Sequence, residues 1–286
     1  MFNDLISIVL PIYNEEKVIE ETINDIKTAC RDSRINFEII AVNDCSKDRS
    51  SEILQNIDGI KVISHKINQG YGASIKTGIK NAQGSWILIT DADGTYPNKD
   101  IPKLVSHLPD YDMVIGARTG SKVKIPLVRR PAKWFLNKFA GYLAGHKIPD
   151  LNSGLRVFKK DIAEKYWNLF PNRFSFTSTI TMVCFTNGYS VKYLPINYFR
   201  REGKSSIRPT HFIDFLNLVI KLSLFFKPIK VFALLSLFLF LLGLGVGFYS
   251  KLVLGQLADV ITVLLMITAL QTFFFGLIAE LIIRKK

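Results

Sequence analysis

The chain has 286 residues, of which 48% are hydrophobic, and it carries a net charge of +13. This length is enough to bury one full core and to leave further segments outside it. The three cysteines, Cys30, Cys45 and Cys184, are widely spaced and follow no pattern. They argue against a disulfide framework or a zinc cluster and indicate reduced thiols.

The charge is unevenly distributed along the chain. Residues 1–117 contain 12 Lys and Arg against 17 Asp and Glu, a net charge of −5, whereas residues 118–286 contain 25 against 7, a net charge of +18. An acidic half suits cation binding, and a basic half beside apolar segments suits phosphates and anionic lipid head groups. Nucleic acid is not expected as a partner, because the basic residues flank the apolar segments and no nucleic-acid-binding motif is present.

Apolar runs and turn residues predict strands that alternate with helices in the first half of the chain. The expected strands are 7–12, 37–42, 60–64, 86–90 and 112–117, and the expected helices are 15–30, 73–82, 98–108 and one capped by Asp48 or Ser50. This alternation is typical of an α/β fold with a mostly parallel sheet covered on both faces. Ligands bind such sheets beyond the carboxyl ends of the strands.

The strand expected at residues 86–90 stops at two aspartates, Asp91 and Asp93, and the turn residues Gly94 and Pro97 follow. In extended backbone, residues two apart point to the same side, so both carboxylates can converge on one point. Two carboxylates there suit Mg²⁺ or Mn²⁺, which complete their coordination with water and phosphate oxygens. The alternative is that these residues only form a turn.

Other polar residues stand where the remaining strands are expected to end. Asn14 and Glu15 follow the first strand, Asp44 follows the second, and Arg118 follows the fifth. Because the carboxyl ends of parallel strands meet at one edge of the sheet, these side chains and the two aspartates define a candidate site. Glu15 is also open to interpretation as an acid in the first turn of a helix.

Two long apolar segments lie in the last part of the chain, residues 230–286. Residues 231–250 and 259–282 are each long enough to cross a bilayer as a helix. Lys and Arg flank the pair on its outer sides and only Lys251 lies between them, which predicts an integral membrane protein with both termini in the cytoplasm. No signal peptide is expected, because the first apolar stretch is short. The glycines within 242–247 would let helices approach closely, so a homo-oligomer is left open.

Two further segments have amphipathic patterns. Residues 126–146 carry Trp134, Phe135 and Tyr142 at helical spacing among Lys and Arg, which favours a helix lying in the membrane interface. The alternative is an ordinary helix packed on the core. Residues 210–229 show a similar pattern and lead into the first apolar segment.

Seven short motifs follow one another between residues 5 and 208. They are Val9-Leu-Pro-Ile-Tyr-Asn-Glu15, Val42-Asn-Asp44-Cys-Ser-Lys-Asp48, Asn68-Gln-Gly70, Asp91-Ala-Asp93-Gly, Gly116-Ala-Arg118, Asn152-Ser-Gly154-Leu-Arg156 and Arg200-Arg-Glu-Gly203-Lys-Ser205. In this order and spacing the chain resembles the family 2 glycosyltransferases of GT-A fold, most closely the dolichyl- or polyprenyl-phosphate sugar synthases. The resemblance implies a cytoplasmic GT-A catalytic domain at residues 1–209, followed by a transmembrane hairpin.

The resemblance also implies a set of site residues. A UDP- or GDP-linked sugar would be bound by Pro11, Tyr13, Asn14, Glu15, Val42, Asp44, Ala92, Arg156, Arg200 and Arg201. The acceptor phosphate would be bound by Arg118, Arg130, Lys133, Asn137, Ser153 and Lys204. Asp91 and Asp93 would hold Mg²⁺ or Mn²⁺ and, with Arg118, would stabilise the leaving diphosphate as the catalytic residues.

The activity implied is transfer of one hexose to a polyprenyl phosphate such as undecaprenyl or dolichyl phosphate. A phosphate monoester with a second pKa of about 6 is already largely ionised at neutral pH, so we assign no general base and expect one inverting displacement. Two alternatives are a processive polysaccharide synthase and a catalytically silent membrane scaffold that binds nucleotide sugars. A missing Gln-x-x-Arg-Trp motif argues against the first, and intact Asp91, Asp93 and Arg118 argue against the second.

Three features depart from the family pattern. Gly94 and Thr95 stand where many relatives have a Gln, which leaves the third protein ligand of the metal open. Ser206 replaces a Lys that reaches phosphate in relatives, so Lys204, Arg201 or Arg208 would have to serve. The chain has two apolar spans where some relatives have four or none.

Overall fold

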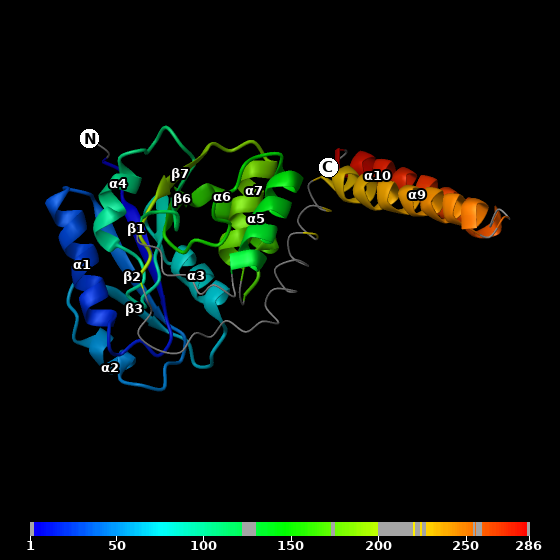
Figure 1. Cartoon of the computed structure of the whole chain (residues 1–286). Coiled ribbons are helices and arrows are strands. Elements are labelled where there is room, and N and C mark those ends of the chain that lie inside the picture. Colours follow the sequence, from blue (N-terminus) through cyan, green and yellow to red (C-terminus); the bar gives the residue numbers. More distant parts are fainter. Residues whose placement is uncertain are drawn as a thin grey trace. The chain divides into compact units, whose positions relative to one another are not determined.

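The computed structural model of the protein describes residues 3–121, 130–172, 175–199, 227–253 and 259–284, together with positions 220, 224 and 255. The chain divides into two compact units, Met1–Leu216 and Asn217–Lys286 (Figure 1). The first unit is built around a sheet, and the second is a pair of long helices. The expected boundary at residue 209 and nearly all of the expected amphipathic segment 210–229 lie outside the described residues.

Seven strands of the described chain form one sheet in the order β3-β2-β1-β4-β6-β5-β7. Their bounds are β1 Ile6–Ile12, β2 Phe37–Asn43, β3 Lys61–Ser64, β4 Trp86–Ile89, β5 Met113–Ala117, β6 Arg156–Lys159 and β7 Val191–Pro195. β6 is antiparallel to both neighbours, and the other pairs are parallel. Ile12 pairs with Asn43, and Val9 pairs with Ile89, so β1, β2 and β4 all end at the same edge.

The predicted α/β fold with a mostly parallel sheet is confirmed, and the five expected strands agree with β1 to β5 within one residue at each end. β6 and β7 were not predicted. β6 has four residues with a charge at each end, Arg156 and Lys159, and β7 is largely half-exposed. Both strands are held by pairing with β5, which is distant in sequence, so local composition does not reveal them.

Helices cover both faces of the sheet (Figure 1). α1 (Ile19–Asp32), α2 (Ser50–Gln55) and α4 (Ile101–Val105) lie on one face, and α3 (Tyr71–Lys80), α5 (Arg130–Ala144) and α7 (Phe176–Thr186) lie on the other. The remaining short elements are η1 Asn98–Asp100, α6 Lys160–Lys165 and η3 Trp167–Leu169. Buried Ile and Leu side chains of β1, α1 and α4 form much of the core, which fixes the strand ends that carry the polar residues.

The helix expected at residues 15–30 begins later, at Ile19, so this prediction was wrong at its start. Asn14 has a φ of 58°, in the left-handed region. The Glu15 amide donates to Ser50 Oγ at 2.9 Å, and the Glu16 amide donates to Asp48 Oδ2 at 3.1 Å. These bonds tie the chain after β1 to the start of α2, so it leaves the strand as a loop.

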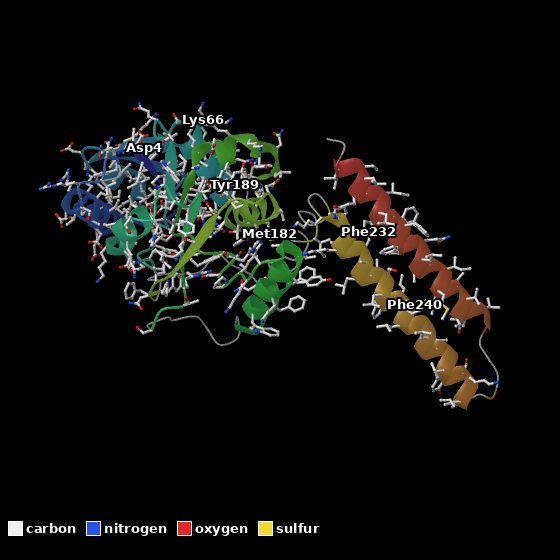
Figure 2. All side chains as sticks on the ribbon, turned by 90° about the horizontal axis from the view of Figure 1, so that it is seen from above. Asp4, Lys66, Met182, Tyr189, Phe232 and Phe240 are labelled. Carbon is white, nitrogen blue, oxygen red and sulfur yellow. The ribbon has the colours of Figure 1, made fainter. Side chains whose placement is uncertain are left out.

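The main described elements of the second unit are α9 (Pro228–Val253) and α10 (Asp259–Arg284), which pack along one another. Both are long and apolar enough to cross a membrane, with mean hydropathies of 2.6 and 2.2 in their most apolar windows. The predicted pair of apolar helices is therefore confirmed. Phe240 of α9, labelled in Figure 2, is 43% exposed, and many other apolar side chains of the hairpin are exposed too. A surface of this composition suits contact with lipid chains.

Small residues line the contact between the two helices. A Cβ on Gly276 would lie 2.6 Å from Cβ of Phe232, which is labelled in Figure 2, so only glycine fits there. Gly243 and Gly247 also face α10, whereas a Cβ on Gly245 would meet no atom within 4 Å. Two of the glycines in 242–247 therefore serve packing within the hairpin.

Candidate active site

Asp91 and Asp93 lie just beyond the carboxyl end of β4, as the sequence predicts. Asp93 is buried, and its Oδ1 accepts hydrogen bonds from the Thr95 amide at 3.2 Å and the Thr95 hydroxyl at 2.6 Å. The Thr90 hydroxyl donates to Asn98 Oδ1 at 2.9 Å, which links the strand end to η1. The turn carrying the two carboxylates is thus held in place by its own side chains.

Asp91 lies between an aromatic hydroxyl and a glycine. The Tyr71 hydroxyl donates to Asp91 Oδ1 at 2.9 Å. A Cβ on Gly154 would lie 2.6 Å from Asp91 Oδ2, so the absence of a side chain lets this backbone come close to the carboxylate. The Gly154 amide donates to the Tyr96 hydroxyl at 2.7 Å. The segment before β6 is therefore packed directly onto the candidate metal ligand.

The two carboxylates fit a hard divalent cation. No group of three or more His, Cys, Asp and Glu side chains is gathered for a metal ion within the described ranges. Two carboxylates suffice for Mg²⁺ or Mn²⁺, because such ions commonly keep water and take phosphate oxygens of a substrate. The donor chemistry of Asp91 and Asp93 therefore fits residues that would hold a divalent metal ion.

The loops that follow β1 and β2 are joined by hydrogen bonds. The Asn14 amide donates to Ser46 Oγ at 3.0 Å, and the Lys47 amide donates to Asn14 Oδ1 at 2.7 Å. Glu15 is buried beside them, with its amide bound to Ser50. The predicted nucleotide-binding residues Asn14 and Glu15 thus lie in two loops that are joined by hydrogen bonds at the candidate edge.

Asp44 follows β2, as predicted. It is buried, and its carboxylate binds its own chain. Oδ1 accepts from the Gln69 amide at 2.8 Å and lies 2.7 Å from His65 Nδ1, and Oδ2 accepts from the Gly70 amide at 2.8 Å. The other ring nitrogen of His65 lies 2.9 Å from Thr77 Oγ1. Asp44 therefore anchors the loop between β3 and α3 at the end of β2.

Arg118 is held by an unpredicted partner. Its Nε donates to Asp150 Oδ2 at 2.7 Å and its Nη2 to Asp150 Oδ1 at 2.8 Å, and the Asp150 side chain is fully buried. The guanidinium also lies 5.2 Å from the ring centroid of Tyr198. Because the pair is bidentate, the orientation of the Arg118 fork is set before any ligand binds.

Arg156 was expected to bind phosphate, and the structure corrects this prediction. Its side chain is fully buried and its guanidinium is used inside the core. Nη1 donates to the Thr177 carbonyl at 2.7 Å and to Thr181 Oγ1 at 2.8 Å, and Nε donates to the Ser153 carbonyl at 3.0 Å. Arg156 thus joins β6 to α7 and has no access to a ligand at the sheet edge.

Two predicted ligands of the acceptor phosphate also turn inward, which corrects both predictions. Ser153 is fully buried and donates to the Gly116 carbonyl. Asn137 on α5 donates to the Pro149 carbonyl at 2.7 Å and accepts from the Leu151 amide at 3.2 Å. Both polar groups satisfy backbone of residues 116 and 149–151, because buried backbone groups need partners.

The other predicted site residues differ in their exposure, and several of them lie outside the described residues. Pro11 is partly exposed on β1 and Tyr13 is 41% exposed just after it. The side chains of Val42 and Ala92 are buried, and Val42 is paired with Pro11 of β1 and Ile63 of β3 within the sheet. The side chains of Arg130 and Lys133, and all of Arg200, Arg201 and Lys204, lie outside the described residues.

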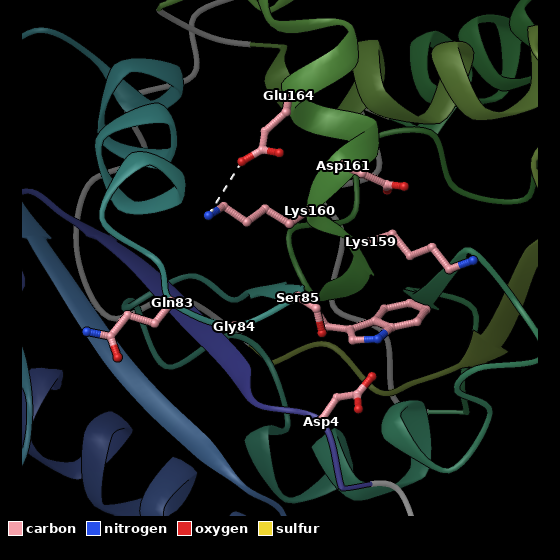
Figure 3. Close-up of a pocket in the computed structure, with 9 residues that line it drawn as sticks. Asp4, Gln83, Gly84, Ser85, Lys159, Lys160, Asp161 and Glu164 are labelled. Atoms are coloured by element: carbon pink, nitrogen blue, oxygen red, sulfur yellow. Dashed lines mark ion pairs between the residues drawn. The ribbon is translucent and has the colours of Figure 1, made fainter.

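A separate pocket lies at the opposite edge of the sheet, beside the amino end of β4 (Figure 3). Its lining includes Asp4, Trp86 and the ion pair of Lys160 with Glu164 at 3.4 Å. Charges of both signs are mixed there, and Trp86 is the first residue of β4, whereas Asp91 lies beyond its last residue. This pocket is therefore distinct from the candidate site.

Four residues of the site were not predicted from the sequence: Tyr71, Tyr96, Asp150 and Gly154. Gly154 belongs to the motif Asn152-Ser-Gly154-Leu-Arg156. A glycine just before a strand can mark a place where the backbone comes close to another group, and this signal was available in the sequence. Nothing local distinguishes the two tyrosines or Asp150, whose partners come from distant segments.

The sequence matches the family Glycosyl transferase family 2 over residues 7–167, and it matches the GtrB C-terminal hairpin over residues 227–284. The chain belongs to glycosyl transferase family 2. It is therefore a glycosyltransferase, related to polyprenyl-phosphate sugar transferases. The second match coincides with α9 and α10, so the hairpin has counterparts in other proteins.

Several characterised and uncharacterised proteins are similar to this family 2 chain. An uncharacterised protein of Methanocaldococcus jannaschii is 34% identical over 228 residues, 77% of this chain and 91% of the relative. The low-salt glycan biosynthesis hexosyltransferase Agl6 of Haloferax volcanii is 31% identical, over 71% of this chain and 49% of the relative. An undecaprenyl-phosphate 4-deoxy-4-formamido-L-arabinose transferase of Pseudomonas paraeruginosa is 32% identical, over 56% and 49%. The match thus spans about half the length of these last two relatives.

Solved structures share the fold of this glycosyltransferase. Glucosyl-3-phosphoglycerate synthase from Mycobacterium tuberculosis, in complex with Mn²⁺, UDP and phosphoglyceric acid, aligns with a TM-score of 0.61 at 16% identity, over 77% of this chain and 78% of its own. S. aureus TarS with UDP-GlcNAc aligns with a TM-score of 0.56 at 19% identity, over 76% and 66%. The predicted GT-A architecture of the first unit is thereby confirmed.

Proposed function

We propose that the protein transfers a single hexose from a UDP- or GDP-linked sugar to a polyprenyl phosphate, in a reaction that depends on Mg²⁺ or Mn²⁺. The observation that carries this proposal is the carboxylate pair Asp91 and Asp93 at the edge where β1, β2 and β4 all end. The sequence relation to polyprenyl-phosphate sugar transferases supports a lipid acceptor. The two apolar helices support a reaction at the membrane.

Different residues are proposed to bind different parts of the nucleotide-sugar donor. Asp91 and Asp93 would hold the metal, whose charge when bound stabilises the leaving diphosphate. Asp44 Oδ2 accepts one hydrogen bond, from Gly70, within the described residues, so it can still accept one from a ribose hydroxyl or a base N–H. Asn14 and Glu15 line the same edge from the neighbouring loop.

Arg118 is proposed to bind the acceptor phosphate or the diphosphate. Two of its nitrogens bind Asp150, and its Nη1 makes no hydrogen bond to the described residues. A fixed guanidinium with a free donor suits a phosphate oxygen better than a flexible ammonium group does. Arg130, Lys133 and Lys204 are the further proposed ligands of the acceptor.

The chemical step is a single displacement. An oxygen of the lipid phosphate attacks the anomeric carbon, the bond from that carbon to the diphosphate breaks, and the nucleoside diphosphate leaves with the electron pair. The acceptor is already an anion at neutral pH, so no side chain has to remove a proton. The sugar is then bonded to the lipid phosphate, and its anomeric carbon has the inverted configuration. The protein aligns the reactants and stabilises the charge on the leaving diphosphate.

The membrane arrangement is part of the proposal. α9 and α10 would cross the bilayer, with the first unit and both chain termini on the cytoplasmic side, because Lys227 lies just before α9, Lys230 lies at its start and Arg284 stands at the end of α10. A cysteine introduced at Gly255 should then react with an impermeant thiol reagent from outside intact cells. A cysteine added after Lys286 should react only after the membrane is opened, and the reverse pattern would contradict the orientation.

The test of activity uses the whole chain purified in detergent. It would be incubated with a panel of UDP- and GDP-linked sugars, undecaprenyl or dolichyl phosphate, and Mn²⁺, and the lipid fraction would be analysed by mass spectrometry. A lipid phosphate carrying one sugar is the expected product, and the panel identifies the sugar. Long polymer would instead indicate a processive synthase. Metal-independent nucleotide binding without transfer from any donor would indicate a silent scaffold.

A further inference from the structure

We infer that Tyr71 is a positioning residue that holds the Asp91 carboxylate in the orientation in which it binds the divalent metal. This inference rests on the proposed function, because it assigns the support of one of the two proposed metal ligands. Tyr71 is the first residue of α3, and Asp91 follows β4, so the contact joins two segments that are 20 residues apart.

The carboxylate of Asp91 is confined on two sides. The Tyr71 hydroxyl donates to Oδ1 at 2.9 Å. Gly154 lies against Oδ2, where an added Cβ would come within 2.6 Å, and the amide of Gly154 is itself held by the Tyr96 hydroxyl at 2.7 Å. A carboxylate held by this hydrogen bond and by a close backbone contact has few alternative orientations, so less freedom is lost when a metal binds.

Hydrogen bonds of the residues before and after Tyr71 fix its position. The preceding residues Gln69 and Gly70 donate their amides to the two oxygens of Asp44, both at 2.8 Å, and Gly70 has a φ of 98° that favours glycine. After Tyr71, the Ala73 amide donates to the Asn172 carbonyl at 2.6 Å. The loop is therefore anchored on Asp44, the proposed nucleotide ligand, while its next residue contacts Asp91.

The Tyr71 hydroxyl is the donor in this contact, because an ionised carboxylate can only accept hydrogen bonds. A ligating carboxylate commonly needs such an outer hydrogen bond, and removing one lowers metal affinity or activity by roughly ten- to a hundredfold.

The test compares Tyr71→Phe with Tyr193→Phe in the full-length protein. Tyr193 is a matched control, because its buried hydroxyl has no hydrogen-bond partner among the described residues. Free Mn²⁺ would be measured by electron paramagnetic resonance while protein with UDP is titrated, and the thermal midpoint of each variant would be recorded. Asp91→Asn identifies the part of Mn²⁺ binding that belongs to the site.

We expect Tyr71→Phe to weaken Mn²⁺ binding by about tenfold while Tyr193→Phe leaves it unchanged. Relative to wild type, the transfer activity of Tyr71→Phe should be lowered strongly at low Mn²⁺ and only weakly at saturating Mn²⁺. Unchanged Mn²⁺ affinity in Tyr71→Phe, even with a lowered thermal midpoint, would overturn the inference alone, because Tyr71 would then be merely structural. Wild-type Mn²⁺ binding that does not depend on Asp91 would overturn the proposed metal site as well.

Discussion

Arg118 and Asp150 form a buried, bidentate ion pair beside the candidate active site, with N to O distances of 2.7 and 2.8 Å. The Arg118 amide also donates to Asp150, at 3.0 Å, so one carboxylate holds both the backbone and the side chain at the end of β5. The Asp150 side chain has no exposed surface, and that of Arg118 is 15% exposed. The pair therefore fixes Arg118 at the end of β5, where we propose that it binds a phosphate.

Replacing Asp150 with Ala should destabilise the first unit by about 3 kcal/mol, because Arg118 would be left as a mostly buried charge without its partner. Urea unfolding followed by tryptophan fluorescence measures this, since all three tryptophans lie in that unit. The control is Glu52→Ala, which removes an exposed partner of Arg49 and should cost less than about 1 kcal/mol. Equal effects of the two substitutions would contradict a structural role for the pair.

Gly154→Ala should impair metal binding, because the new Cβ would lie 2.6 Å from Asp91 Oδ2 and would have to push the carboxylate aside. We expect Mn²⁺ affinity and the transfer rate at limiting Mn²⁺ to fall by roughly ten- to a hundredfold. Gly245→Ala is the matched control, since its Cβ would meet no atom within 4 Å. A Gly154→Ala protein with wild-type Mn²⁺ affinity would show that the close contact does not constrain Asp91.

Cys45 should be the fast-reacting thiol of the chain, and nucleotide should protect it. Cys45 is partly exposed next to Asp44, whereas burial raises the pKa of Cys30 to about 12 and also raises the pKa of Cys184. Reaction with a chromogenic disulfide reagent should slow about tenfold when UDP and Mn²⁺ are present at about ten times the dissociation constant of UDP. Cys45→Ala should abolish the fast phase. An unprotected Cys45 would place the nucleotide elsewhere.

The contact between α9 and α10 can be tested by cross-linking. A Cβ on Gly247 would lie 4.0 Å from Cβ of Thr262, within the range of disulfides, whereas a Cβ on Gly245 would have no neighbour within 4 Å. In a chain whose native cysteines are replaced by Ala, Gly247→Cys with Thr262→Cys should form a disulfide under mild oxidation. Gly245→Cys with Thr262→Cys should remain reduced. Mass spectrometry of the linked peptides distinguishes the two, and linkage of the second pair alone would contradict the packing.

The parts of the fold that the sequence predicts are those with local causes. The five strands β1 to β5 and the two apolar helices depend on runs of apolar side chains, and the position of Asp91 and Asp93 depends on where one such run stops. β6 depends instead on pairing with β4 and β5, so its own four residues carry little signal.

The predicted site was less accurate where arginine and amide side chains were concerned. Arg156 and Asn137 are polar residues near the expected site, but each satisfies backbone carbonyls supplied by distant segments. Which carbonyl groups need a partner depends on the packing of the whole unit, and a motif does not contain this information. Asp44 is a further example. Its position at the end of a strand was predicted, but the hydrogen bonds that its carboxylate accepts from the Gln69 and Gly70 amides were not.

The central claim is that Asp91 and Asp93 together bind the metal that a transfer to lipid phosphate requires. The most direct measurement is the initial rate of sugar transfer to polyprenyl phosphate by wild type, Asp91→Asn, Asp93→Asn and the exposed control Asp25→Asn, each with Mn²⁺ and with excess EDTA. We predict that each site variant and EDTA lower the rate by about a hundredfold or more while the control keeps it. A site variant that transfers sugar at the wild-type rate, or a wild-type rate that persists in EDTA, would contradict the account.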